Sequence, residues 1–112
     1  MLLVNLGRLL MEVGQLEEAR PLLEEALQAR REALGDRDPD TLDSVNCMGD
    51  LLEKQGKFTE AIPLFTEELE GLVLLHGMEY QATRDSAKHL VELLRNSGQR
   101  EEAEALAAKH GV

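Results

Sequence analysis

The segment at residues 51–61 reads LLEKQGKFTEA, and two other parts of the chain repeat its outline. Residues 9–19 read LLMEVGQLEEA and residues 93–103 read LLRNSGQREEA. Each copy has a Leu-Leu pair, then a glycine and then an alanine, and successive copies lie 42 residues apart. A fixed period of 20–50 residues is typical of stacked repeat arrays. The repeat therefore predicts the fold, and such a fold favours a binding surface over an active site.

Each period reads as two helices. In the second period, Leu42, Val45, Met48 and Leu51 recur every three residues, which places them on one helical face. We expect Asp40 or Thr41 to cap the start of this helix, and Gly56 to end it in a left-handed conformation. A second helix is predicted from about Phe58, with an apolar stripe that runs to Val73. The same pattern predicts helix pairs at about 2–13 with 16–34 and at about 80–97 with 100–109.

The connections between these helices are only a few residues long, so neighbouring helices should be antiparallel. The predicted fold is all-α, an α-solenoid of about three helix hairpins in one domain over residues 1–112. The repeats are expected at about 1–35, 36–77 and 78–112, with the first truncated at its N-terminus. In this register Met1 matches Asp43, so Leu2, Leu3 and Leu6 should be partly uncovered and form a docking edge. Either the chain is a fragment of a longer array or another element packs on that edge.

Composition excludes several classes of protein. The chain has 112 residues and a net charge of −10, whereas nucleic-acid binders need clustered Lys and Arg for phosphate contacts. No apolar run reaches the length of about 18 residues that a membrane span needs. The one cysteine, Cys47, allows no internal disulfide and suits a reducing compartment such as the cytoplasm rather than secretion. We therefore expect no nucleic-acid partner and no membrane insertion.

The acidic charge is concentrated in the middle of the chain. Residues 36–77 carry 10 acidic and only 3 basic side chains. This field would steer a basic partner toward the second repeat, and its effect fades within about 8–10 Å at physiological salt. The other interpretation is that acidic surface mainly keeps the protein in solution.

The pattern Leu6-Gly7, Leu9-Leu10, Gly14, Leu16, Glu18-Ala19, Leu23, Ala26-Leu27 resembles the tetratricopeptide repeat. The period exceeds the usual 34 residues of that family. The stretches Ala29–Leu42 and Val45–Ala61 look like the long repeats of kinesin light chains, although Asn46-Cys47 stands where two asparagines are usual. The resemblance implies a right-handed superhelix that binds peptides or partner proteins along its concave side, which the first helix of each pair lines. The implication for cargo transport is much weaker, because fold does not fix function.

In this register the predicted partner-binding residues are polar positions on the first helices that are not used for packing. An Asn46 amide could hold the backbone of an extended peptide, the acids would favour Lys or Arg, and Arg8 or Lys88 could hold a carboxylate. The alternative is that this polar face only contacts water and binds no partner. The residues are Asn5, Arg8, Asp43, Asn46, Cys47, Asp50, Asp85, Lys88, His89 and Glu92.

Catalytic and metal-binding interpretations find little support in the sequence. Cys47 and His89 occupy the same position in adjacent repeats, which is about 10 Å apart and too far for a thiol–imidazole pair. One cysteine and three scattered histidines do not make a structural zinc site. The adjacent acids on the second helices, among them Glu67-Glu68, are expected to form a solvated face. We therefore expect no catalytic residue, no metal and no cofactor.

Three functions remain open from the sequence. The first is a non-enzymatic adaptor or scaffold that binds a protein or peptide segment in its concave groove, with basic segments among the candidates. The second is a structural subunit of a large assembly, docked through Leu2, Leu3 and Leu6. The third is a module of an enzyme whose catalytic domain lies outside this chain.

Overall fold

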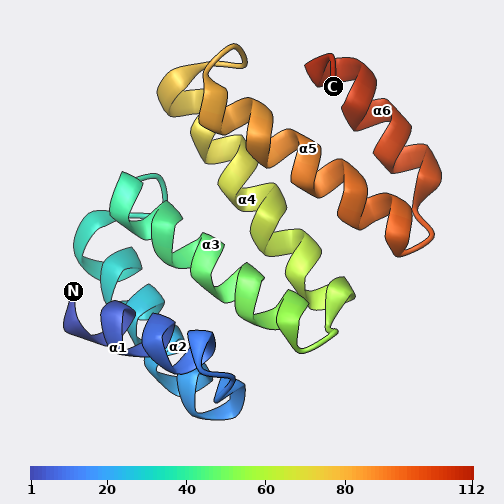
Figure 1. Cartoon of the computed structure of the whole chain (residues 1–112). Helices are drawn as coiled ribbons and strands as arrows, with labels where there is room; N and C mark the ends of the chain where they lie inside the picture. The colour runs from blue at the N-terminus through green and yellow to red at the C-terminus, as the bar shows by residue number, and fades with distance from the viewer.

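The computed structural model describes all residues from Met1 to Val112 and contains six helices and no strand. The helices form three antiparallel hairpins that stack in chain order, with the two termini at opposite ends of the stack (Figure 1). The helices are α1 (Leu2–Glu12), α2 (Leu16–Leu34), α3 (Pro39–Lys54), α4 (Phe58–His76), α5 (Gln81–Asn96) and α6 (Arg100–His110). The stack measures 38 × 28 × 19 Å. The predicted all-α solenoid is confirmed.

Helix boundaries follow the expected signals, with one correction at the start of α3. The N-cap is Asp38 rather than Asp40 or Thr41, and its side chain accepts a hydrogen bond from the Asp40 backbone N–H. Pro39 occupies the first turn, where its missing N–H leaves no bond unmade. Thr41 is instead fully buried and donates to the Arg30 backbone oxygen at 3.3 Å, which ties α3 to α2.

The turn within each hairpin depends on a glycine in the left-handed region. Gly14, Gly56 and Gly98 have φ of 86°, 76° and 82°, and each lies just after the C-cap residue of the first helix of its pair. Backbone of this kind favours glycine because a Cβ atom would be strained there. The 42-residue glycine period is therefore the period of the tight turns.

The core consists of two apolar clusters along the stack. One joins α1, α2 and α3 around Leu23 and Leu51, and the other joins α3 to α6 around Phe65 and Leu90. Leu64 packs against both clusters and so makes the core continuous. Every helix therefore depends on its neighbours to cover its apolar face, as in other repeat arrays.

Inside each hairpin, one pair of residues sets how closely the two helices approach. A Cβ atom on Gly7 would lie 2.6 Å from the Leu23 side chain, and one on Gly49 would lie 2.9 Å from the Phe65 ring. The corresponding pair in the third hairpin is Val91 with Ala107, and both are buried in the same cluster. In the first two hairpins a glycine on the first helix thus faces a large side chain on the second helix. In the third hairpin the larger residue, Val91, is on the first helix and the smaller, Ala107, is on the second.

Candidate partner-binding groove

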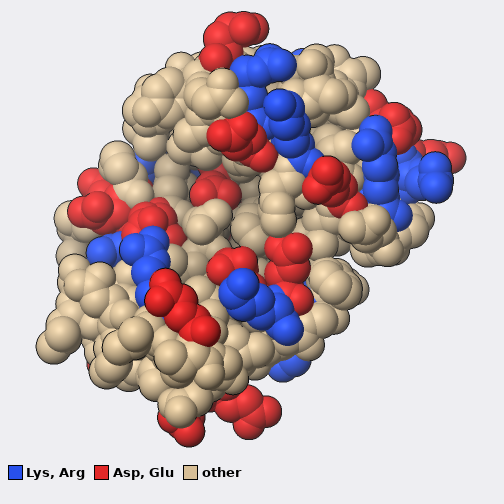
Figure 2. Space-filling model, in the orientation of Figure 1, with Lys and Arg blue, Asp and Glu red and all other residues tan.

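The candidate site is a groove lined by the first helices of the hairpins. α1, α3 and α5 face the same side, and Figure 2 shows this side hollowed between α3 and α5 with acidic and basic side chains around the hollow. A recess of about 320 Å³ lies there. Its lining residues come from α3, α4 and α5, and are Asn46, Glu68, Leu72, Ala82, Asp85, Ser86 and His89. Three of the ten residues predicted from the sequence, Asn46, Asp85 and His89, therefore meet in one recess.

Glu68 is the central charged group of this recess, and the sequence interpretation missed it. Its Oε1 atom accepts hydrogen bonds from Asn46 Nδ2 at 3.2 Å and from Ser86 Oγ at 3.4 Å. Neither donor carries a charge, and Glu68 forms no ion pair. Burial raises the pKa of Glu68, while the bonds from Asn46 and Ser86 and the nearby His89 act in the opposite direction. The recess thus contains a poorly solvated carboxylate whose protein partners are all uncharged.

His89 closes one side of the recess and links the second and third hairpins. Its Nε2 atom lies 2.8 Å from Glu53 Oε1 on α3, and its ring packs edge-on against Phe65 with centroids 4.7 Å apart. An aromatic contact of this geometry orients the ring as well as covering it. His89 is therefore held between α3 and α4 and cannot swing freely in the groove.

Arg8, Asp43 and Cys47 form a second cluster, where α1 meets α3. Arg8 Nη2 donates to Asp43 Oδ1 at 2.6 Å and Arg8 Nε donates to Cys47 Sγ at 3.1 Å. Arg30 from α2 approaches the other oxygen of Asp43 at 3.6 Å. These side chains satisfy one another, so Arg8 is paired inside the protein rather than free to hold a ligand's carboxylate.

Cys47 does not have the surroundings of a nucleophile. The thiol is 3 % exposed, and burial raises its pKa although Arg8 acts in the opposite direction. A thiol with a raised pKa is protonated at neutral pH and reacts slowly. His89 is bonded to Glu53 instead of to this sulfur. No group of three or more His, Cys, Asp and Glu side chains is arranged to hold a metal ion.

The remaining predicted residues lie around the groove without a shared geometry. Asp50 is 3.9 Å from Lys54 on its own helix, and Asp85 accepts a bond from Gln81 at 2.8 Å. Asn5, Lys88 and Glu92 are exposed and make no side-chain hydrogen bond or ion pair. These positions can contact a partner, but nothing in the protein orients them.

The acidic pair Glu67-Glu68 corrects the expectation of a solvated face. Glu67 is half-buried and bound in bidentate fashion by Arg31 of α2, with Arg31 Nη2 at 2.9 Å from Glu67 Oε1. Arg31 also donates to Asp36, at 2.9 Å, so it ties α2 and the following loop to α4. Glu67 thus stabilises the stack from the side, whereas Glu68 points into the groove recess.

Comparison with known proteins agrees with this architecture. The sequence profile of the tetratricopeptide repeat matches residues 1–72, which is more than half of the chain. The chain belongs to the tetratricopeptide repeat family. A search of curated protein sequences found no match. No helix of this tetratricopeptide repeat protein combines the length and the apolar character needed to cross a membrane.

Two solved structures show how far the likeness extends. The nearly identical TPR-like repeats of a Podosopora anserina kinesin light chain structure align with a TM-score of 0.79 at 23 % identity, covering 96 % of this chain and 51 % of that one. BtubC (BKLC) from P. vanneervenii aligns with a TM-score of 0.85 at 18 % identity, covering 96 % and 42 %. This tetratricopeptide repeat chain thus spans about half the length of these structures. At such identities the likeness concerns the fold, which is the kinesin light chain-like helical repeat.

Proposed function

We propose that the chain is a non-enzymatic interaction module that binds a basic segment of a partner protein in the groove between α3 and α5. Tetratricopeptide repeats are in general protein–protein interaction modules, which supports the class of function. The observation that carries the finer proposal is Glu68, a poorly solvated carboxylate at the recess with which no Lys or Arg of the protein forms an ion pair.

Charge around Glu68 favours a Lys or Arg side chain as the occupant. Asp85 lines the same recess, and Asp50 and Glu53 lie on the adjacent helix α3. A guanidinium or ammonium group placed at Glu68 would form a charge-assisted hydrogen bond where the protein supplies only neutral donors. The amide of Asn46 and the hydroxyl of Ser86 would then fix the carboxylate in position for that bond.

Fluorescence anisotropy with two labelled peptides tests this proposal. One peptide alternates Ser and Lys, and its counterpart alternates Ser and Glu. We expect only the Ser–Lys peptide to bind, with an affinity that falls as salt is added because the contacts are electrostatic. Glu68→Gln keeps the shape of the side chain and removes its charge, and should weaken binding about fivefold, as for the loss of a half-exposed ion pair.

Glu102→Gln provides the matched control. Glu102 is exposed on α6, and its replacement changes the net charge of the protein by the same amount. If Glu102→Gln weakens binding as much as Glu68→Gln does, general acidity rather than the recess attracts the peptide and the proposal fails. Equal binding of the two peptides would also overturn it.

A second candidate function rests on the outer face of α1. Leu2, Leu6, Leu9 and Val13 are 80 %, 43 %, 55 % and 62 % exposed and follow one side of this helix. The matching positions of α3 are Ser44, Met48, Leu51 and Gln55, and α2 packs against α3 there. The structure places Leu3 differently from its neighbours, because it is half-buried against the core.

We propose on this ground that α1 docks against a helix of a partner, as α3 docks against α2. An affinity pull-down from native extract with the variant Leu2→Glu/Leu6→Glu tests this, after circular dichroism has shown that the variant is folded. A partner that Leu2→Glu/Leu6→Glu loses and Glu68→Gln retains supports edge docking. A partner that only Glu68→Gln loses assigns binding to the groove.

A further inference from the structure

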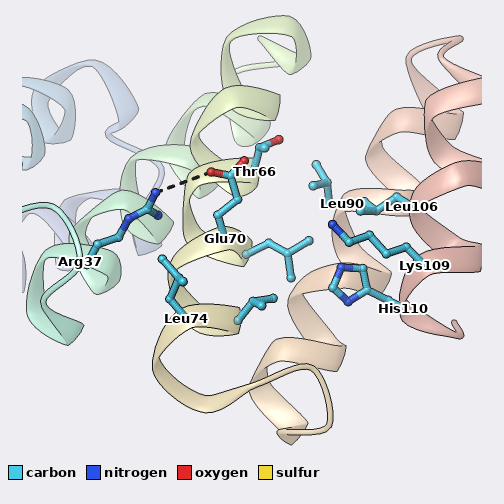
Figure 3. Close-up of a pocket in the computed structure, with 10 residues that line it drawn as sticks. Arg37, Thr66, Glu70, Leu74, Leu90, Leu106, Lys109 and His110 are labelled. Carbon is cyan, nitrogen blue, oxygen red and sulfur yellow. Dashed lines mark ion pairs between the residues drawn. The ribbon is translucent and has the colours of Figure 1, made fainter.

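A second recess, of about 380 Å³, lies between α4, α5 and α6 and shares no residue with the groove recess. It opens where α6 ends at His110 after 11 residues, whereas α4 runs for 19 residues. Figure 3 shows α4 as its floor and the end of α6 as its wall. Its apolar lining consists of Leu69, Val73, Leu74, Leu90 and Leu106. The recess is therefore a separate apolar surface that α6 leaves uncovered.

Lys109 is the unpaired charge of this recess. Its ammonium group points over the recess from α6 and makes no ion pair (Figure 3). The one carboxylate in the lining, Glu70, already lies 3.7 Å from the Arg37 guanidinium at the far side. The recess thus combines an apolar floor with one unpaired positive charge, Lys109, at one end.

His110 adds a polar atom that the protein does not satisfy. The side chain is 6 % exposed, and its Nδ1 atom is buried without any hydrogen-bond partner. Burial lowers the pKa of His110, and the charge of Lys109 lowers it further, so the imidazole is neutral at physiological pH. A buried polar atom without a partner costs free energy, so the protein leaves this end of α6 incompletely hydrogen-bonded.

We propose that this recess binds a small aliphatic carboxylate, with its hydrocarbon chain on the leucine floor and its carboxylate at Lys109. The volume is within the range of about 300–1,000 Å³ that small-molecule sites occupy. Burial of the chain supplies the affinity, and the ammonium group selects the anionic end. Arg37 and Glu70, which lie opposite Lys109, are already paired with each other, so a cationic ligand finds no free carboxylate there.

Titration of the ¹⁵N-labelled chain with octanoate, followed by ¹H–¹⁵N correlation spectra, tests this proposal. We expect saturable shifts for amides of α4, α5 and α6 around the recess, with a dissociation constant in the millimolar range. Octan-1-ol has the same chain without the charge and should bind more weakly. Saturable shifts confined to the groove between α3 and α5, or no saturable shift at all, would overturn the proposal without bearing on peptide binding in the groove.

Two variants locate the site. Lys109→Gln should weaken octanoate binding about fivefold and leave octan-1-ol binding unchanged, and Lys57→Gln removes the same charge far from the recess as a control. Thr66→Phe places a ring in the recess and should abolish the binding of both ligands, while the spectra report whether the variant is folded. If Lys109→Gln binds octanoate as the wild type does, the carboxylate assignment is wrong. If the folded Thr66→Phe variant binds both ligands normally, the recess is not the site.

Discussion

Single side chains decide how tightly the helices of each hairpin pack. Gly49 lies so close to Phe65 that a Cβ atom has no space, and Gly7 has the same relation to Leu23. The third hairpin uses Val91 and Ala107 at these positions. Since interiors pack at near-crystalline density, the volume of the two residues together has to be conserved.

This relation predicts a coupled pair of substitutions. Gly49→Val should destabilise the protein by about 1–3 kcal/mol or more, because the added methyl groups meet the Phe65 ring. The double variant Gly49→Val/Phe65→Ala copies the third hairpin and should regain at least about 1 kcal/mol relative to the sum of the single changes. Urea unfolding followed by circular dichroism measures both. Additive effects would show that the two positions do not share space.

Glu68 gives a prediction on pH dependence. Burial raises its pKa in the folded chain above the unfolded value, so the folded state binds the proton more tightly. The contribution of Glu68 to stability is then fully present below the unfolded pKa and is lost as the pH rises through the folded pKa. Glu68→Gln, which stays neutral, should be more stable than the wild type at pH 7 by at most about 1 kcal/mol.

Urea unfolding of the wild type and Glu68→Gln across the acid range checks this. The advantage of the variant should shrink as the pH falls toward 4, because the wild-type carboxylate becomes neutral too. An advantage that grows toward acid pH would mean that the carboxylate is stabilised as an anion in the fold. Glu102→Gln serves as the exposed control.

At the scale of helices, stability depends on burial between one hairpin and the next. Leu51 on α3 is fully buried in the cluster that joins α1, α2 and α3. Leu51→Ala should therefore cost about 2–5 kcal/mol through the cavity it leaves. Leu74→Ala is the matched control, because Leu74 is 71 % exposed and its loss should cost little. Urea unfolding of both variants distinguishes them, and similar costs would contradict the core assigned to α3.

The whole molecule is a short stack, and its helices bury different numbers of residues against their neighbours. α3 buries nine residues between α2 and α4, whereas α6 buries three and packs mainly on α5. In repeat arrays stability is close to a sum of local terms and contacts between neighbours. The end of the stack beyond α5 should therefore open more readily than its middle.

Hydrogen exchange followed by mass spectrometry tests this gradient. Amides of α6 should exchange at least about tenfold faster than those of α3 after correction for intrinsic rates, since local openings have lower free energies than global unfolding. Octanoate in excess should slow exchange in α6 if it binds in the recess beside Lys109. Equal protection of α3 and α6 would show that the stack unfolds as one unit.

The local pattern of the sequence was enough to predict the helices. Leucine spacing, the left-handed glycines and the 42-residue period act between near neighbours, and the predicted helices agree with the observed ones to within about two residues. The predicted N-cap of α3, Asp40 or Thr41, was wrong by two or three positions. Asp38, Asp40 and Thr41 are all good caps, and only the packing of Thr41 against Arg30 selects among them.

The candidate site depended on tertiary structure. Asn46, Asp85 and His89 were predicted as members of one face, but the recess also needs Glu68 from α4, which looked like one of several solvated acids. Its register offers a signal, because the positions 42 residues before and after Glu68 are Ala26 and His110, and both are buried. Periodicity within one helix determines which residues share a face. Which charges find a partner across two helices depends on how the hairpins stack, and only the folded chain decides that.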